Sequence, residues 1–171
     1  MGYTHYWRRP RNNAGSAYMY GKLALDAKKI IEKAQEQGID IAGPHGTDEP
    51  MFSEVSFSLN GADNRSTGGQ DGSYETFCWE GIPSIQEWRK DQQTTFDFCK
   101  TAFRDYDAVV TAILIRAKHI YGSCVEVSSD GNWDNQDKNA IDDYGTWTAG
   151  RELYEQTFSE VAECPFDEVS V

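Results

Sequence analysis

Three stretches of the chain space their apolar residues as the buried face of a helix does. The first is expected to start after Ser16, as its N-cap, and to end near Gln37, before Gly38. Its apolar stripe is formed by Leu23, Ala27, Ile30, Ile31 and Ala34. The second is expected between Asp105, as its cap, and Gly122. Its stripe is formed by Val109, Val110, Ile113, Leu114 and Ala117.

The third helix is expected over about Thr148–Val161, with Leu153, Phe158 and Val161 facing inward. Between the helices, short apolar runs are typical of strands. The clearest is Glu54–Leu59, where alternation places Val55, Phe57 and Leu59 on one face. The other expected strands are Tyr3–Trp7, Ile39–Ala42, Tyr74–Trp79, Phe96–Cys99 and Cys124–Ser128.

The order of these elements predicts the fold class. Consecutive strands in the middle of the chain, with the polar, Gly-rich segment Asn60–Gly72 as a long hairpin loop, indicate antiparallel pairing. We therefore expect one α+β domain over residues 1–171, a mainly antiparallel sheet with two or three helices packed on one face. Ile85 and Trp88 are expected to anchor a short helical turn, and residues 129–147 to form a polar loop beside a site.

Charge narrows the possible partners. The net charge is -12, but residues 1–38 alone have a balance of +4 and residues 39–171 one of -16. An acidic body disfavours general binding to nucleic acid, whose phosphates need a basic surface. The four cysteines are widely spaced, which favours reduced thiols, and no apolar leader or membrane-length apolar run is present. We expect a cytoplasmic protein that does not bind membranes.

The first strand is unusually rich in aromatic residues. Alternation places Tyr3, His5 and Trp7 on one face and Thr4 and Tyr6 on the other, so the strand is expected to be central and covered on both sides. Core packing with a hydrogen-bonded histidine explains this pattern. The alternative is a stacking surface for a planar base, with phosphates held by the arginines that follow, Arg8, Arg9 and Arg11.

A second candidate site lies in the sequence FCKTAFRDYD, residues 98–107. Lys100, Thr101 and Arg104 stand where a strand is expected to pass into a helix. A helix N-terminus offers free N–H groups and a positive dipole end, which suits an anionic group. A capped helix with surface ion pairs explains the same residues equally well.

Metal and cofactor chemistry find no support in the sequence. Asp130, Asn132 and Asp134 imitate the opening of a calcium loop, but Asn135 and Ile141 stand where that loop needs Gly and Glu. The three histidines are scattered. No metal and no cofactor are expected.

These blocks together resemble a family of small uncharacterised proteins found in phages and bacterial genomes. The resemblance covers most of the chain and rests on MGYTHYW at the start, AGPHGT, SLNGAD and YETF in the middle, and FCKTAFRDYD and VSSDGNW later. It implies a phage or bacterial, intracellular setting. It brings no activity, cofactor or catalytic residue.

The polar and aromatic residues at strand ends and element starts predict a pocket for a nucleotide-like ligand. The candidate ligand-binding residues are Tyr3, His5, Trp7, Arg8, Glu75, Lys100, Thr101, Arg104, Tyr106 and Asp130. In a phage, such a protein would sequester a host nucleotide signal. Two alternatives remain: an acidic inhibitor of a basic host protein, and an enzyme that processes a nucleotide or phosphoester with His5 and Asp130 as acid and base.

Overall fold

The computed structural model describes residues 3–83, 93–134 and 145–167. Its principal elements are β1 (Thr4–Pro10), α1 (Ala17–Glu36), β2 (Ile41–Ala42), β3 (Met51–Phe52), β4 (Ser56–Gly61), β5 (Phe77–Glu80), β6 (Thr94–Lys100), α2 (Asp107–Tyr121), β7 (Glu126–Ser129) and α3 (Thr148–Phe158). The expected turn at Ile85 and Trp88 and most of the expected loop 129–147 lie outside the described residues.

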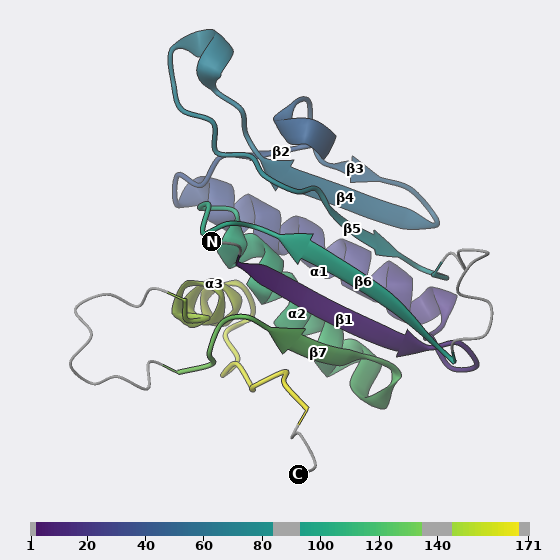
Figure 1. Cartoon of the computed structure of the whole chain (residues 1–171). Coiled ribbons are helices and arrows are strands. Elements are labelled where there is room, and N and C mark those ends of the chain that lie inside the picture. The colour runs from purple at the N-terminus through teal and green to yellow at the C-terminus, as the bar shows by residue number, and fades with distance from the viewer. Residues whose placement is uncertain (1–2, 84–92, 135–144, 168–171) are drawn as a thin grey trace.

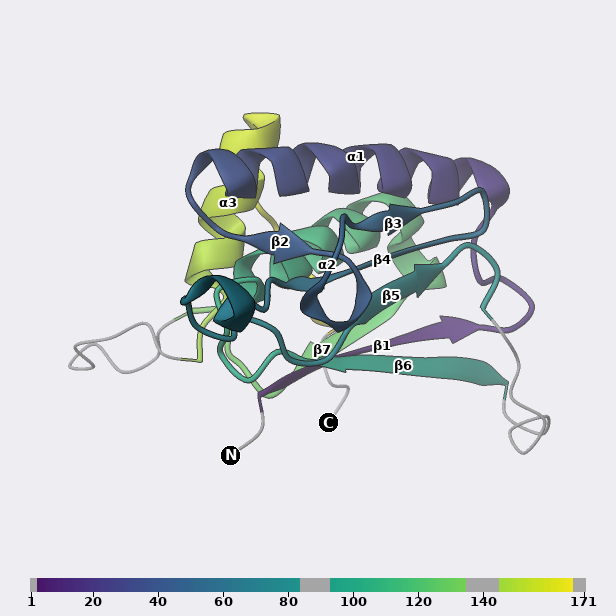
Figure 2. The ribbon, with the colours of Figure 1, turned by 90° about the horizontal axis from the view of Figure 1, so that it is seen from above.

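The strands form two antiparallel sheets. One has the order β6-β1-β7, and the other has the order β2-β4-β3 with β5 paired to β4 (Figure 1). The helices lie on one side of the three-stranded sheet, whose opposite side no described helix covers (Figures 1 and 2). The α+β class is therefore confirmed, and the division of the strands into two sheets is a feature that the apolar pattern alone did not reveal.

Helix α1 follows its sequence pattern closely. Ser16 is its N-cap and accepts a hydrogen bond from the Met19 amide at 3.2 Å. The expected stripe is buried along its whole length, and Gly38 takes a positive φ of 85° just after the helix. The observed cap, buried stripe and final glycine are those that the sequence predicts, so the prediction of this helix is confirmed.

The other two helices differ from expectation at their ends. Asp105 does not cap α2, because the amides of Asp107 and Ala108 bond to the carbonyls of Arg104 and Asp105 at 2.8 and 3.3 Å. A backbone turn thus replaces the side-chain cap. Helix α3 ends at Phe158, so Val161, expected to face inward, lies on the surface.

Strand β4 also starts later than expected. Phe57 and Leu59 are buried as the alternation predicts, but Val55 lies before the strand and is 70% exposed. Strand β4 pairs with β5 in antiparallel orientation, with Phe57 opposite Trp79, which confirms the expected antiparallel pair of strands.

The loop between β4 and β5 packs tightly against the end of β4, and this gives a test of the fold. A Cβ on Gly61 would lie 2.1 Å from the Gly72 carbonyl oxygen, whereas one on Gly21, in α1, would meet nothing within 4 Å. We expect Gly61→Ala to lower the free energy of unfolding by about 2 kcal/mol and Gly21→Ala to raise it by about 0.5–1 kcal/mol. Urea denaturation measures both. Equal effects of the two substitutions would contradict the packing of this loop.

Two further properties of the described residues bear on the expectations above. The four cysteines are free thiols, with Cys99 and Cys124 buried. No helix among residues 3–83, 93–134 and 145–167 is both long and apolar enough to cross a membrane.

Candidate functional site

Strand β1 divides the candidate residues between its two faces. It is the central strand of its sheet, as expected, and Tyr3, His5 and Trp7 are buried on the face toward the helices. On the opposite face Tyr6 is only partly buried and Arg8 is exposed. The expectation that both faces are covered is therefore wrong, because the helices pack on one side alone.

His5 is the centre of a buried polar cluster. Its Nε2 lies 2.7 Å from Asp107 Oδ1, and its Nδ1 lies 2.9 Å from Ser129 Oγ. Ser129 Oγ also accepts hydrogen bonds from the Gly131 amide at 2.9 Å and the Trp147 indole N–H at 3.2 Å. We assign its own proton to the bond with Nδ1, so His5 carries its proton on Nε2 and donates it to Asp107.

The expected anion site at the start of α2 is absent from this arrangement. Thr101 is buried and donates its hydroxyl proton to Asp107 Oδ1, the same oxygen that His5 reaches. The first amides of α2 bond to backbone carbonyls, so they offer no free donors to an anion. The hydroxyl of Thr101, expected to contact an anionic group, thus bonds to the carboxylate of Asp107 instead. Lys100 points away from it, to the other face of the sheet.

A cavity of about 360 Å³ opens beside this cluster. Asp107, Tyr3 and Phe103 form part of its wall, and the rings of Tyr3 and Phe103 stack with centroids 4.1 Å apart. Arg104 lies exposed at its rim. The cavity therefore combines an apolar wall with a fixed carboxylate and has a single arginine at its edge.

The face of the three-stranded sheet that lies away from the described helices, called the uncovered face below, carries a row of aromatic rings. Tyr6 and Phe96 stack with centroids 5.9 Å apart, and Phe96 lies 6.1 Å from Phe98. Phe98 is 53% exposed. Tyr6 is paired with Phe98 in the register of β1 and β6, so these rings form one continuous surface.

Two cations flank this row, each beside an aromatic ring. The Arg8 guanidinium lies 5.3 Å from the ring centre of Phe96, and Lys100 Nζ lies 5.5 Å from that of Tyr74. Tyr74 is 45% exposed. We call this surface, made of Tyr6, Arg8, Tyr74, Phe96, Phe98 and Lys100, the aromatic face.

Carboxylates stand along one side of the aromatic face, on and after β7. Asp130 accepts hydrogen bonds from the Thr4 amide at 3.0 Å and the Tyr6 hydroxyl at 3.2 Å. Glu126 is paired with Arg8 in the register of β1 and β7. The β7 side of the sheet is therefore acidic, and the β6 side holds Lys100.

Glu75 fixes the end of β6 rather than reaching toward a ligand. Its carboxylate accepts a hydrogen bond from the Lys100 amide at 2.8 Å, and its carbonyl accepts one from the Tyr106 hydroxyl at 2.8 Å. Burial raises the pKa of Tyr106, whose ring is enclosed in the core. The Glu75 carboxylate thus lies beside Lys100, and the Tyr106 ring is in the core.

Arg9, expected to meet phosphates, is fully buried. Its Nη1 donates to the Glu80 carbonyl at 2.6 Å and its guanidinium lies 4.6 Å from the centre of the Trp79 ring. Burial lowers the pKa of Arg9. Because it is sealed between the sheets and α2, its charge is not offered to a solvent-borne ligand.

The structure therefore places the candidate ligand-binding residues in four different locations. The aromatic face receives Arg8, Lys100 and, at its acidic side, Asp130. The interior receives Tyr3, His5, Trp7, Thr101 and Tyr106. Arg104 lies at the rim of the 360 Å³ cavity, and Glu75 lies between the two sheets. His5 and Asp130 bond to different partners, so they do not form the acid–base pair considered from the sequence.

Four residues of the aromatic face are absent from the candidate list: Tyr6, Tyr74, Phe96 and Phe98. A signal for two of them was present, because Phe96 and Phe98 alternate along the predicted strand Phe96–Cys99 and must share a face. Which face stays uncovered depends on where the helices pack. The sequence of the strand alone does not determine which of its faces the helices cover.

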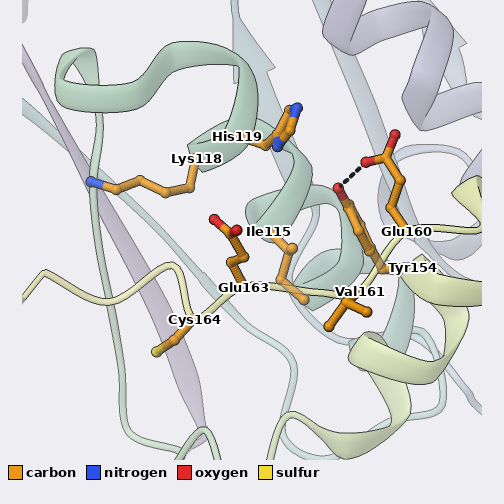
Figure 3. A pocket seen from close by; sticks show the side chains of 8 residues that line it. All are labelled: Ile115, Lys118, His119, Tyr154, Glu160, Val161, Glu163 and Cys164. Atoms are coloured by element: carbon orange, nitrogen blue, oxygen red, sulfur yellow. Dashed lines mark hydrogen bonds between the residues drawn. The ribbon is translucent and has the colours of Figure 1, made fainter.

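Another cavity, of about 640 Å³, lies between the end of α2 and the chain that follows α3 (Figure 3). Its lining includes Lys118, His119, Glu163 and Cys164, and Tyr154 donates a hydrogen bond to Glu160 at 3.1 Å across it. In the part of the chain that the structure describes, no cluster of histidines, cysteines and carboxylates is arranged to hold a metal ion.

Comparison with known proteins gives no match to a family model, to a curated protein or to a solved structure.

Proposed function

We propose that the protein binds a small nucleotide-like ligand on the aromatic face. The observation that carries this proposal is the row of rings formed by Tyr6, Phe96 and Phe98 on the uncovered side of the sheet, with Arg8 and Lys100 beside it. Tyr6 and Phe96 are partly buried and Phe98 is 53% exposed, so Phe98 keeps a large apolar ring at the surface. A ligand with its own flat, apolar surface would bury such a ring when it binds.

The chemistry of the aromatic face suits a nucleobase and a phosphate together. Stacking of a base on an aromatic side chain contributes about 1–3 kcal/mol and needs only a flat ring such as Phe98. The phosphate would pair with the Arg8 guanidinium, whose planar fork bonds two oxygens at once. The rings hold the base and the cations fix the direction of the phosphate.

Binding without turnover is the form of the function that we favour. The aromatic face places no nucleophile with a base beside it, and His5 is enclosed on the other side of the sheet. In the phage or bacterial setting that the family resemblance implies, the protein would hold a host nucleotide signal and so lower its free concentration.

The proposal predicts the effect of removing one ring. Titration calorimetry with AMP, ATP, GTP and their relatives is expected to show binding by the native protein, and Phe98→Ala to weaken it at least tenfold, since one stacking platform is lost. Tyr18→Ala is the matched control, because Tyr18 is a 78% exposed aromatic on α1, away from this sheet. No heat with any member of the panel, or equal losses in both variants, would contradict the proposal.

A further inference from the structure

We infer that the aromatic face takes a ligand with two nucleotide units and a phosphate at each end, such as a linear dinucleotide, in preference to a single nucleotide. The inference rests on the proposed function and adds the size and charge pattern of the ligand. It follows from the doubling of one structural unit, a cation placed beside an aromatic ring, along a single sheet face.

The two units are alike in kind and stand at opposite ends of the row. In the first, the Arg8 guanidinium lies 5.3 Å from the centre of the Phe96 ring. In the second, Lys100 Nζ lies 5.5 Å from the centre of the Tyr74 ring. Each unit supplies what one nucleotide needs, a flat surface for the base and a positive charge for the phosphate.

The strand register gives the separation of the units. Arg8 is opposite Phe96, whereas Lys100 is opposite Thr4, four residues away along β1. Four residues of a strand extend over about 13 Å. Phe98, opposite Tyr6, lies midway between the two units, so the apolar surface continues from one to the other.

The charges set the path of the ligand over the sheet. Glu126 and Asp130 make the β7 side acidic, and they repel a phosphate placed there. The β6 side carries Lys100 and the exposed ring of Phe98, and the Glu75 carboxylate at its end is held by the Lys100 amide. A chain with two anionic ends is therefore expected to lie along β1 and β6, from Arg8 to Lys100.

A single nucleotide cannot use this arrangement fully. AMP has one base and one phosphate, so it engages one cation and leaves the other in solvent. The linear dinucleotide pApAp has two bases and a phosphate at both ends. Once one end of pApAp is bound, the phosphate at its other end meets the second cation within the same complex. This contact adds affinity without a second loss of translational freedom.

Calorimetry with AMP and pApAp at low salt tests the inference. We expect pApAp to bind at least tenfold more tightly than AMP. Arg8→Ala and Lys100→Ala are each expected to reduce the affinity for pApAp to the level of AMP, and only one of them to weaken AMP. Lys22→Ala, an exposed lysine of α1, is the matched charge control and is expected to change neither affinity.

The outcomes separate the two proposals. Equal affinities for AMP and pApAp, both lost in the same single variant, would overturn the two-unit ligand and leave the proposed function standing. Tight binding of pApAp that survives both Arg8→Ala and Lys100→Ala would place the ligand elsewhere and overturn the inference. Absence of binding for both compounds would overturn the proposed function as well.

Discussion

Replacing His5 by alanine is expected to lower the free energy of unfolding by about 3 kcal/mol, although no ligand or solvent reaches its ring. His5 is fully buried and joins Ser129, at the end of β7, to Asp107, at the start of α2. The substitution removes both hydrogen bonds and leaves a cavity where the imidazole was. The Asp107 carboxylate then keeps Thr101 as a donor but loses its ring partner.

Urea denaturation at neutral pH measures this loss. Ser129→Ala is expected to cost about 2 kcal/mol, because it takes the acceptor from the buried Trp147 indole N–H but leaves the His5–Asp107 bond in place. His119→Ala, at an exposed histidine of α2, is the matched control and is expected to have no measurable effect. A loss below 1 kcal/mol for His5→Ala would show that the cluster does not tie the sheet to the helix.

The elements that the sequence predicts best are those in which several local signals agree. In α1 the cap at Ser16, the apolar stripe and the stop at Gly38 all point to the same helix. In α2 the stripe is correct but the cap is not, because a turn that ends at Tyr106 supplies the bonds that the Asp105 side chain was expected to make. Apolar spacing is set by packing, while a cap depends on local chain geometry.

The candidate site was predicted less well, since it depends on contacts between distant segments. The sequence singled out His5 as a ligand-binding candidate, but its hydrogen-bond partners Asp107 and Ser129 lie 102 and 124 residues away in the sequence. Nothing in their spacing indicates that they meet. Arg8 and Lys100 were both selected, but as parts of different sites. Only the register of β1 and β6 shows that they share one face.

The buried face of α1 contains one charged residue that the apolar pattern did not predict. Asp26 falls between Leu23 and Ala27 on the inner face of α1, and the apolar stripe was described without it. Burial of a carboxylate is costly unless a cation reaches it. Its partner comes from α2, which the local sequence of α1 cannot reveal.

Replacing Asp26 by alanine is expected to be the most destabilising single change, with a loss of about 4 kcal/mol. Asp26 Oδ2 accepts a hydrogen bond from Arg116 Nε at 2.8 Å, and both side chains are almost fully buried. Arg116 also reaches the Tyr154 hydroxyl at 3.3 Å and lies 4.3 Å from the centre of the Phe158 ring, so the ion pair joins all three helices. Without Asp26, the guanidinium is left buried with its main counterion gone.

The same pair predicts how stability depends on pH. Burial acts to raise the pKa of Asp26, but hydrogen bonds from Lys29 and Arg116 outweigh it and hold the pKa below its ordinary value. The folded state therefore binds the proton more weakly than the unfolded chain. The contribution of Asp26 is complete above the ordinary carboxyl range, near about pH 4, and is lost as the pH falls through the lower folded value.

Denaturation of the native protein and of Asp26→Asn between pH 7 and pH 3 measures that contribution. The difference between them is expected to be greatest at pH 7, to shrink below about pH 4 as the unfolded chain takes up the proton, and to vanish once the folded carboxylate is also neutral. A difference that stays constant across this range would contradict a charged Asp26 in the folded state.

Replacing both partners distinguishes the cost of an unpaired charge from the worth of the pair. Asp26→Leu combined with Arg116→Met fills the same space with apolar groups, and it is expected to restore most of the stability that Asp26→Ala removes. Tyr154 keeps its bond to Glu160 at 3.1 Å in that variant, so no buried hydroxyl is left without an acceptor. The double variant has no unpaired buried guanidinium. If it is nevertheless as unstable as Asp26→Ala, the loss of stability comes from the missing ion pair, and the pair itself holds the three helices together.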